Sequence, residues 1–129
     1  MPKYSARAAA QNFTFDDLQK TADYCRVRGV KIYLAFNTLL FGDRELRESG
    51  ELIAKAAALG VDAFIVQDLG AARLMRQIAP SIPLHASTQM SVLSAAGMEA
   101  PKQLGIKRVV LPRELSEDEI ATRTDLGME

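Results

Sequence analysis

The sequence predicts an α/β fold in which about four parallel strands alternate with about five helices. Four short β-branched or apolar runs predict the strands, since strands of a parallel sheet are buried on both faces. An amphipathic stretch precedes each run and predicts a helix before each strand. A doubly wound sheet and a TIM-type (β/α) barrel both fit this alternation, although no glycine-rich phosphate loop follows any strand. Four strands are about half of such a barrel, which typically needs about 250 residues.

The first predicted helix begins after Thr14, whose side chain is expected to cap it. Asp17 occupies the third helical position and completes a capping box, and Phe13 is expected to pack on Leu18 as a hydrophobic staple. Gly29 ends the helix, because glycine readily adopts the left-handed conformation found at helix ends. The run "VKIYLAF" then predicts the first strand.

The second and third units repeat this arrangement. A helix is expected from near Asp43 to Gly60, followed by the strand "VDAFIV". A shorter helix is expected over residues 71–79, where Pro80 ends it before the strand "IPLHA".

The fourth helix, "SVLSAAGMEAPKQLG", is the least regular. Pro101 lacks the amide that would bond back to Gly97, so a kink or interruption is expected there. The strand "KRVVLP" follows, and a fifth helix is expected after Ser116, which forms a second capping box with Glu119.

Composition restricts the classes of function. The chain has 16 basic and 16 acidic residues, so no overall basic excess marks a nucleic-acid or membrane surface, although a local patch stays open. No apolar run approaches the roughly 18 residues of a transmembrane helix, and the first ten residues lack a signal-peptide core; a cytoplasmic protein is expected. The single cysteine, Cys25, excludes an internal disulfide and a zinc or iron–sulfur centre of its own, and a core position is expected for it.

Polar side chains follow all four predicted strands. The carboxyl ends of parallel strands meet on one face, where α/β proteins build their ligand sites. Each residue alone has a structural explanation in a turn, a cap or an ion pair, but the joint pattern favours a polar site. We expect catalytic roles for His85, Asp68 and Glu114, and substrate binding by Asn37, Gln67, Ser87, Thr88, Gln89 and Arg113.

These residues favour binding and orientation over hydrolysis. His85 and Ser87 are two residues apart in a strand, which separates their Cα atoms by about 6 to 7 Å and disfavours a local catalytic pair. For His85, a structural and a catalytic role are equally compatible with the sequence. No nucleophile elbow or metal-binding helix motif is present, and no metal ligands are expected. Arg113 could grip a carboxylate or a phosphate bidentately.

Five motifs in order, "YSARAAAQNFTFDDL", "YLAFNTL", "DAFIVQDLG", "LHASTQMSV" and "RVVLPREL", resemble the collagenase-like peptidase family U32. Its members are TIM-barrel-like, so the resemblance favours a single incomplete (β/α) barrel over residues 1–129. It also adds Ser5 and Arg7, in the opening loop, to the candidate residues, with Arg7 as a substrate-binding position.

The resemblance implies two chemistries. The family name implies a peptidase, a hydrolase, whereas similar members carry out prephenate-dependent or related hydroxylation of rRNA and tRNA. Those members hold an iron–sulfur cluster on cysteines downstream of the Arg-Glu-Leu motif, and this sequence does not contain them. The complete protein is therefore expected to act on a small molecule, a peptide or RNA, and this chain alone to be an inactive N-terminal barrel portion. The alternative is a binding or assembly module that pairs, or self-associates, through open sheet edges.

Overall fold

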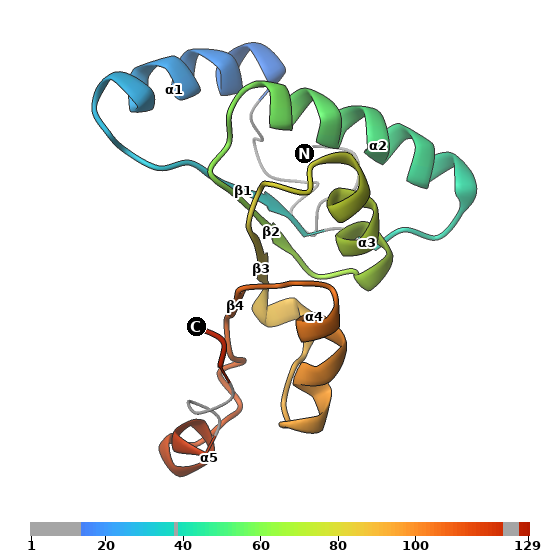
Figure 1. The fold of residues 1–129 in the computed structure, drawn as a ribbon, viewed down its shortest axis with the longest axis vertical. Coiled ribbons are helices and arrows are strands. Elements are labelled where there is room, and N and C mark those ends of the chain that lie inside the picture. Colours follow the sequence, from blue (N-terminus) through green and yellow to red (C-terminus); the bar gives the residue numbers. More distant parts are fainter. Residues whose placement is uncertain (1–13, 38, 123–126) are drawn as a thin grey trace.

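The computed structural model describes residues 14–37, 39–122 and 127–129. Its strands are β1 (Tyr33–Phe36), β2 (Ala63–Val66), β3 (Leu84–Ala86) and β4 (Arg108–Val109). They form one parallel sheet in the order β1-β2-β3-β4 (Figure 1). A doubly wound sheet reverses its strand order part-way, whereas in a barrel each strand is added beside the one before it. The predicted parallel α/β fold is confirmed, and the strand order is that of a barrel.

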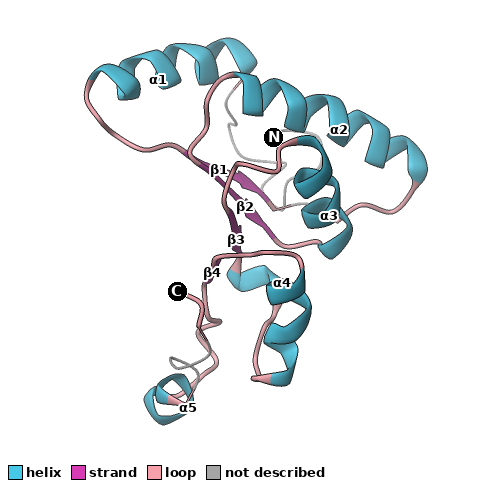
Figure 2. Ribbon diagram, viewed as in Figure 1, coloured by secondary structure: helices cyan, strands magenta, loops and turns pink. Residues whose placement is uncertain are grey.

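The described helices are α1 (Phe15–Val27), α2 (Asp43–Ala58), α3 (Leu69–Ile78), α4 (Glu99–Gln103) and α5 (Glu117–Ala121). Helices α2 and α3 pack against each other beside the sheet (Figure 2). The alternation of strands and helices agrees with the five helices that the sequence predicts. None of the helices in the described ranges combines the length and the apolar character that crossing a membrane requires.

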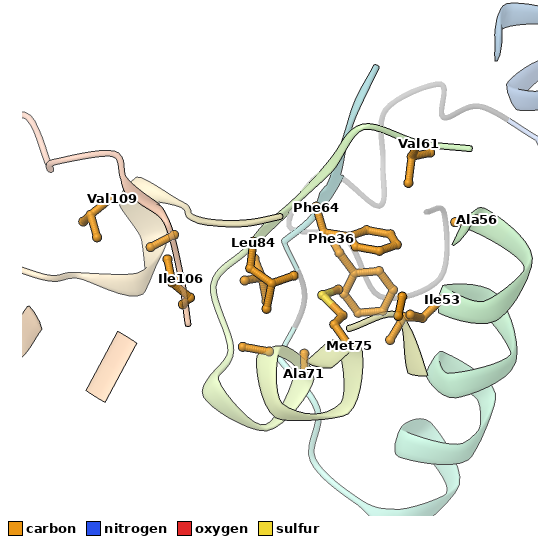
Figure 3. Packing of buried hydrophobic residues seen from close by; sticks show 14 of the residues in the cluster. Phe36, Ile53, Ala56, Val61, Phe64, Ala71, Met75, Leu84, Ile106 and Val109 are labelled. Atoms are coloured by element: carbon orange, nitrogen blue, oxygen red, sulfur yellow. The ribbon is translucent and has the colours of Figure 1, made fainter. Parts of the chain in front are cut away.

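The hydrophobic core lies between the sheet and these two helices. Phe36, Phe64 and Leu84 come from three neighbouring strands and meet Met75 of α3 and Ile53 of α2 (Figure 3). All five side chains are at most 2% exposed. Close packing of such large side chains fixes the helices on this face of the sheet.

The other face of the sheet carries a different row of residues. The register aligns Ala35, Ile65, His85 and Arg108 across the four strands. Side chains alternate between the faces of a strand, so these four point away from the Phe36 side. In a closed barrel this face lines the interior.

The predicted capping boxes are confirmed. Thr14 accepts a hydrogen bond from the Asp17 amide at 3.1 Å, and Ser116 accepts one from the Glu119 amide at 3.3 Å. Gly29 ends α1 with a φ of +66°, a conformation that favours glycine. Phe13, the expected staple, lies outside the described residues.

The fourth unit differs from the prediction. The sequence predicts one helix with a break at Pro101, whereas in the structure a 3₁₀ turn (Ala96–Met98) leads into the short α4. Pro101 falls in the first turn of α4, where no amide has to bond back within the helix, and its side chain is fully buried. Strand β4 has two residues. The Val110 amide that follows it still donates to the Ala86 carbonyl of β3. Pro112, two residues later, has no amide to continue this pairing.

Two smaller differences concern α3 and Cys25. Helix α3 begins at Leu69, two residues before the expected start, because Asp68 caps it. Cys25 is free and half-buried on α1, so it does not occupy the fully buried core position that was expected.

Candidate functional site at the carboxyl edge of the sheet

Three of the predicted site residues lie at one edge of the sheet. Asn37, Gln67 and Ser87 directly follow β1, β2 and β3. The last residues of these strands are in register, so the three residues leave the sheet at one level. The ladder continues as far as Ser87, whose amide donates to the Val66 carbonyl at 2.8 Å. The predicted position of these three residues after the strands is confirmed, and their role in a site stays a prediction.

A pocket of about 360 Å³ opens at this edge. Polar and apolar residues from the loops after β1, β2 and β3, from the start of α3 and from α4 form its wall. Ser91 has a φ of 56° and is the one described residue other than glycine in the left-handed region. Such backbone is uncommon outside glycine and costs conformational energy, which is characteristic of functional loops. The lining includes Leu39, Gln67, Asp68, Met90, Ser91 and Pro101.

Asp68, predicted to be catalytic, has a structural role. Its Oδ1 accepts a hydrogen bond from the Ala71 amide at 2.7 Å and so caps α3. The carboxylate thereby compensates an amide that helix geometry leaves unpaired. Asp68 also lines the pocket, so the same residue fixes the start of α3 and contributes charge to the pocket wall.

The stretch after β3 forms a short 3₁₀ helix over Thr88–Met90. Ser87 is buried, and its hydroxyl accepts a hydrogen bond from the Gln89 amide at 3.3 Å. Thr88 and Gln89 are exposed on this turn. Ser87 therefore shapes the turn that carries the two polar side chains.

Asn37 carries an unsatisfied polar atom. Its Oδ1 is buried and has no hydrogen-bond partner among the described residues. Buried polar atoms are nearly always paired, and leaving one unpaired costs about 1 to 3 kcal/mol. An acceptor of this kind at the carboxyl edge is suited to a ligand donor or an ordered water.

His85 lies within β3, one residue before its end, and is 7% exposed. The ring of Tyr33 meets its imidazole edge to face, with 5.0 Å between the ring centroids. Burial lowers the pKa of His85 below its usual value of 6.5, and the positive charge of Arg108 lowers it further, while Glu129 opposes this effect. His85 is thus held neutral, the state in which imidazole accepts a proton.

Three neighbours of His85 were not predicted from the sequence. Tyr33 and Arg108 lie inside strands, whereas the predicted site residues lie mainly after the strands. Glu129 is brought in by the backbone: it donates to the Lys107 carbonyl at 3.0 Å and accepts from the Val109 amide at 2.8 Å. Its carboxylate accepts a hydrogen bond from Arg108 Nε at 2.9 Å. The charge of Arg108 within an apolar run was the available signal.

The ion pair between Arg108 and Glu129 shifts the pKa of both side chains. The Arg108 guanidinium lowers the pKa of the Glu129 carboxyl, and the hydrogen bond to Glu129 raises the pKa of Arg108.

The remaining candidates lie apart. Arg113 and Glu114 are exposed after β4, and they follow β4 rather than the strand that carries His85. Ser5 and Arg7 lie outside the described residues.

Comparison with known proteins decides the family. The family model described as Peptidase family U32 matches residues 1–129. The chain belongs to peptidase family U32.

Several U32 proteins are similar to most of this chain. The tRNA hydroxylation protein P of Helicobacter pylori is 38% identical over 108 residues, which are 84% of this chain and 25% of that protein. A 23S rRNA 5-hydroxycytidine synthase of Escherichia coli is 36% identical over 92% of this chain and 18% of its own length. A collagenase of Porphyromonas gingivalis is 33% identical over 88% of this chain and 27% of its own length. The chain thus spans about a quarter or less of these relatives.

A solved structure supports the barrel assignment of this U32 chain. The proposed copper homeostasis protein CutC from Streptococcus agalactiae superposes with a TM-score of 0.69 over 88% of this chain and 65% of its own. The sequences are 17% identical, so the likeness concerns the fold alone. The neighbour has a TIM-barrel-like fold, and the predicted partial (β/α) barrel is confirmed.

The iron–sulfur cluster that the U32 resemblance implies does not fit these residues. The sequence has one cysteine, whereas such clusters are held by several thiolates. Among the residues that the structure covers, no group of three or more His, Cys, Asp or Glu side chains is placed to hold a metal ion.

Proposed function

We propose that this chain supplies barrel strands to a U32 protein that hydroxylates tRNA or rRNA. The observation that carries the proposal is its similarity to tRNA and rRNA hydroxylation proteins, at 36 to 38% identity over most of the chain. The activity would belong to the longer protein, because this chain spans at most about a quarter of those relatives. Because tRNA and rRNA are its proposed substrates, the longer protein would act in the cytoplasm.

In this proposal the carboxyl edge orients the substrate. Amide and hydroxyl groups of Asn37, Gln67 and Ser87 would hydrogen-bond the edge of a base or a small co-substrate. His85, neutral and buried below them, would accept a proton at a ring nitrogen. Thr88 and Gln89, exposed on the turn after β3, would contact the substrate beside these residues. Roles in the complete protein are also proposed for Arg113, Glu114 and Arg7, of which Arg7 lies outside the described residues.

The cofactor would come from elsewhere in the longer protein. The proposed iron–sulfur cluster would be held by cysteines outside this sequence and would supply redox chemistry. The co-substrate implied by the family is prephenate, so omitting prephenate from a reaction with purified protein should abolish hydroxylation.

The decisive test is nucleoside mass spectrometry. A full-length U32 protein that contains this sequence should restore the hydroxylated nucleoside in bacteria lacking tRNA hydroxylation protein P. His85→Ala should reduce the product by about a hundredfold or more, since general acid–base groups contribute on that scale. Arg47→Gln, on the exposed side of α2, is the matched control and should leave the product unchanged. Normal product from the His85→Ala protein would remove His85 from the chemistry, and no product from the unaltered protein would refute the proposal.

Peptide hydrolysis is the second candidate, because a collagenase is among the relatives. It predicts that the full-length protein cleaves gelatin and that His85→Ala abolishes the cleavage. Cleavage that survives this substitution would implicate another residue.

A non-catalytic assembly role is the third candidate. Edge strands expose unpaired backbone groups, and β1 is an edge of the described sheet. Self-association through that edge predicts a concentration-dependent dimer of the chain. A stable monomer at high concentration in sedimentation experiments would contradict this assembly role. Hydroxylation by the isolated chain would contradict the expectation that this chain alone is inactive.

A further inference from the structure

The charges of this neutral chain are strongly segregated along the sequence. Residues 69–113 contain six lysines or arginines and one acidic residue, Glu99. The rest of the chain holds ten basic and fifteen acidic residues. The segment from α3 to the turn after β4 therefore carries five excess positive charges, although the whole chain has equal numbers of basic and acidic residues.

Part of this basic segment forms a groove. Its volume is about 510 Å³, and it lies between α3 and the loop that joins α4 to β4. Among the described residues no carboxylate lines this groove, and Arg73 and Lys107 are exposed at its wall. Two amide side chains add hydrogen-bond donors. The polar lining consists of Arg73, Arg76, Gln77, Gln103 and Lys107.

Arg76 gives the groove a rigid base. Its Nε donates to the Leu104 carbonyl at 3.2 Å, and its Nη2 donates to the Gly105 carbonyl at 2.9 Å. Its Nη1 donates to the Pro80 carbonyl at 2.8 Å. All these acceptors are neutral carbonyls, so the bonds hold the guanidinium in place without cancelling its charge by a carboxylate.

The one acid of the segment lies on α4, beside the groove. Glu99 accepts a long hydrogen bond, 3.5 Å, from the Gln103 side chain. It reduces the local positive potential without lining the groove, which makes it a useful site for a test of opposite sign.

We propose that this groove docks the phosphate backbone of RNA. Guanidinium, ammonium and amide donors on an open surface match phosphate oxygens, which accept most of the hydrogen bonds in nucleic-acid complexes. The groove lies at the amino end of the sheet, where Lys107 enters β4, and so away from the carboxyl edge. It would contribute affinity and register but no base specificity. This inference rests on the proposed RNA substrate.

The test measures binding of fluorescently labelled tRNA to the chain by anisotropy over a range of salt concentrations. Replacing Arg73→Gln and Lys107→Gln together should weaken binding about tenfold and reduce the slope of log Kd against log salt by about 1.5, as two lost phosphate contacts predict. Glu99→Gln should tighten binding. Arg76 is left unaltered because its bonds are structural, and circular dichroism checks that each variant is folded.

The matched control removes one lysine and one arginine elsewhere. Lys20→Gln with Arg47→Gln changes the net charge equally on exposed positions of α1 and α2. If the control pair weakens tRNA binding equally, the effect is one of net charge, and the proposed docking groove is wrong. If the groove variant binds tRNA normally but no longer binds polyglutamate or anionic phospholipid vesicles, the groove serves another partner and the RNA proposal is wrong. Absence of tRNA binding by the unaltered chain would also contradict the proposal.

These readouts separate the two proposals. If groove variants lose tRNA binding while the full-length protein forms no hydroxylated nucleoside, the proposed function fails and the docking groove stands. If the full-length protein hydroxylates RNA but the groove substitutions leave tRNA binding unchanged, the docking groove fails and the proposed function stands.

Discussion

At the scale of single residues, the position of His85 determines its chemistry. The strand places its side chain on the face opposite the core, between Tyr33 and Arg108, where burial and a positive neighbour both favour the neutral ring. A serine two residues along the same strand was the nearest catalytic partner that the sequence offered. The neighbours instead come from other strands: Arg108 is paired in register with His85 on β4, and Tyr33 reaches it from β1 across β2.

This environment predicts how stability depends on pH. Since the folded pKa of His85 lies below its ordinary value of 6.5, the native state binds fewer protons than the unfolded state. The contribution of His85 to the free energy of unfolding is fully present above pH 6.5 and is lost as the pH falls through 6.5 toward the folded pKa. His85 is the only histidine, so it dominates this window. Urea unfolding between about pH 7 and 5 should show a loss no steeper than about 1.4 kcal/mol per pH unit.

The control for this prediction is His85→Gln. This variant should show a nearly flat stability over the same range, because the carboxyls with lowered pKa values, Asp17 and Glu129, titrate at lower pH. An equal slope in the variant would assign the pH dependence to another group.

Arg108 should tune the same imidazole. Arg108→Gln removes the nearby positive charge and should raise the pKa of His85, whereas Glu129→Gln should lower it further. The imidazole carbon-bound protons, followed by NMR against pH, report this directly because the chain has one histidine. Arg47→Gln should leave the titration unchanged, and shifts of the same sign in both Arg108 and Glu129 variants would contradict the electrostatic explanation.

At the scale of elements, Arg76 joins α3 to two loops. Its guanidinium hydrogen-bonds carbonyls after α3 and after α4, up to 29 residues away. Arg76→Lys keeps the charge but loses the planar fork, and it should lower the free energy of unfolding by about 1 to 3 kcal/mol. Denaturant titration measures this. Arg73→Lys, exposed on the same helix, should change stability by less than about 0.5 kcal/mol; a similar loss there would disprove the role of the fork.

The sequence predicted best those features whose interacting residues lie within a few positions of one another. The boxes at Thr14 and Ser116 use neighbours three residues apart, so they were predictable. The sequence predicts a break at Pro101, but the structure accommodates this proline in a first turn by starting the helix at Glu99. The pairing of Arg108 with Glu129 depends on sheet register, which no local pattern specifies.

At the scale of the whole molecule, one packed face of the sheet holds the strands and helices together, while the other face carries His85 and Arg108. Phe64 is 0% exposed at the centre of the packed face. Phe64→Ala should cost about 3 to 5 kcal/mol, because it removes a large side chain from a close-packed core. Thermal unfolding measures the effect.

Phe41 provides the matched control, since it is 84% exposed. Phe41→Ala should change the stability by no more than about 0.5 kcal/mol. Comparable losses from the two substitutions would mean that the core does not lie where Figure 3 places it.

The left-handed backbone of Ser91 also restricts which sequences this loop can tolerate. A randomised library at position 91, selected for folded protein, should return glycine and asparagine and should reject valine and isoleucine, whose branched side chains clash in that conformation. At this position of the pocket wall, the backbone conformation rather than any side-chain contact therefore limits which residues can be accommodated.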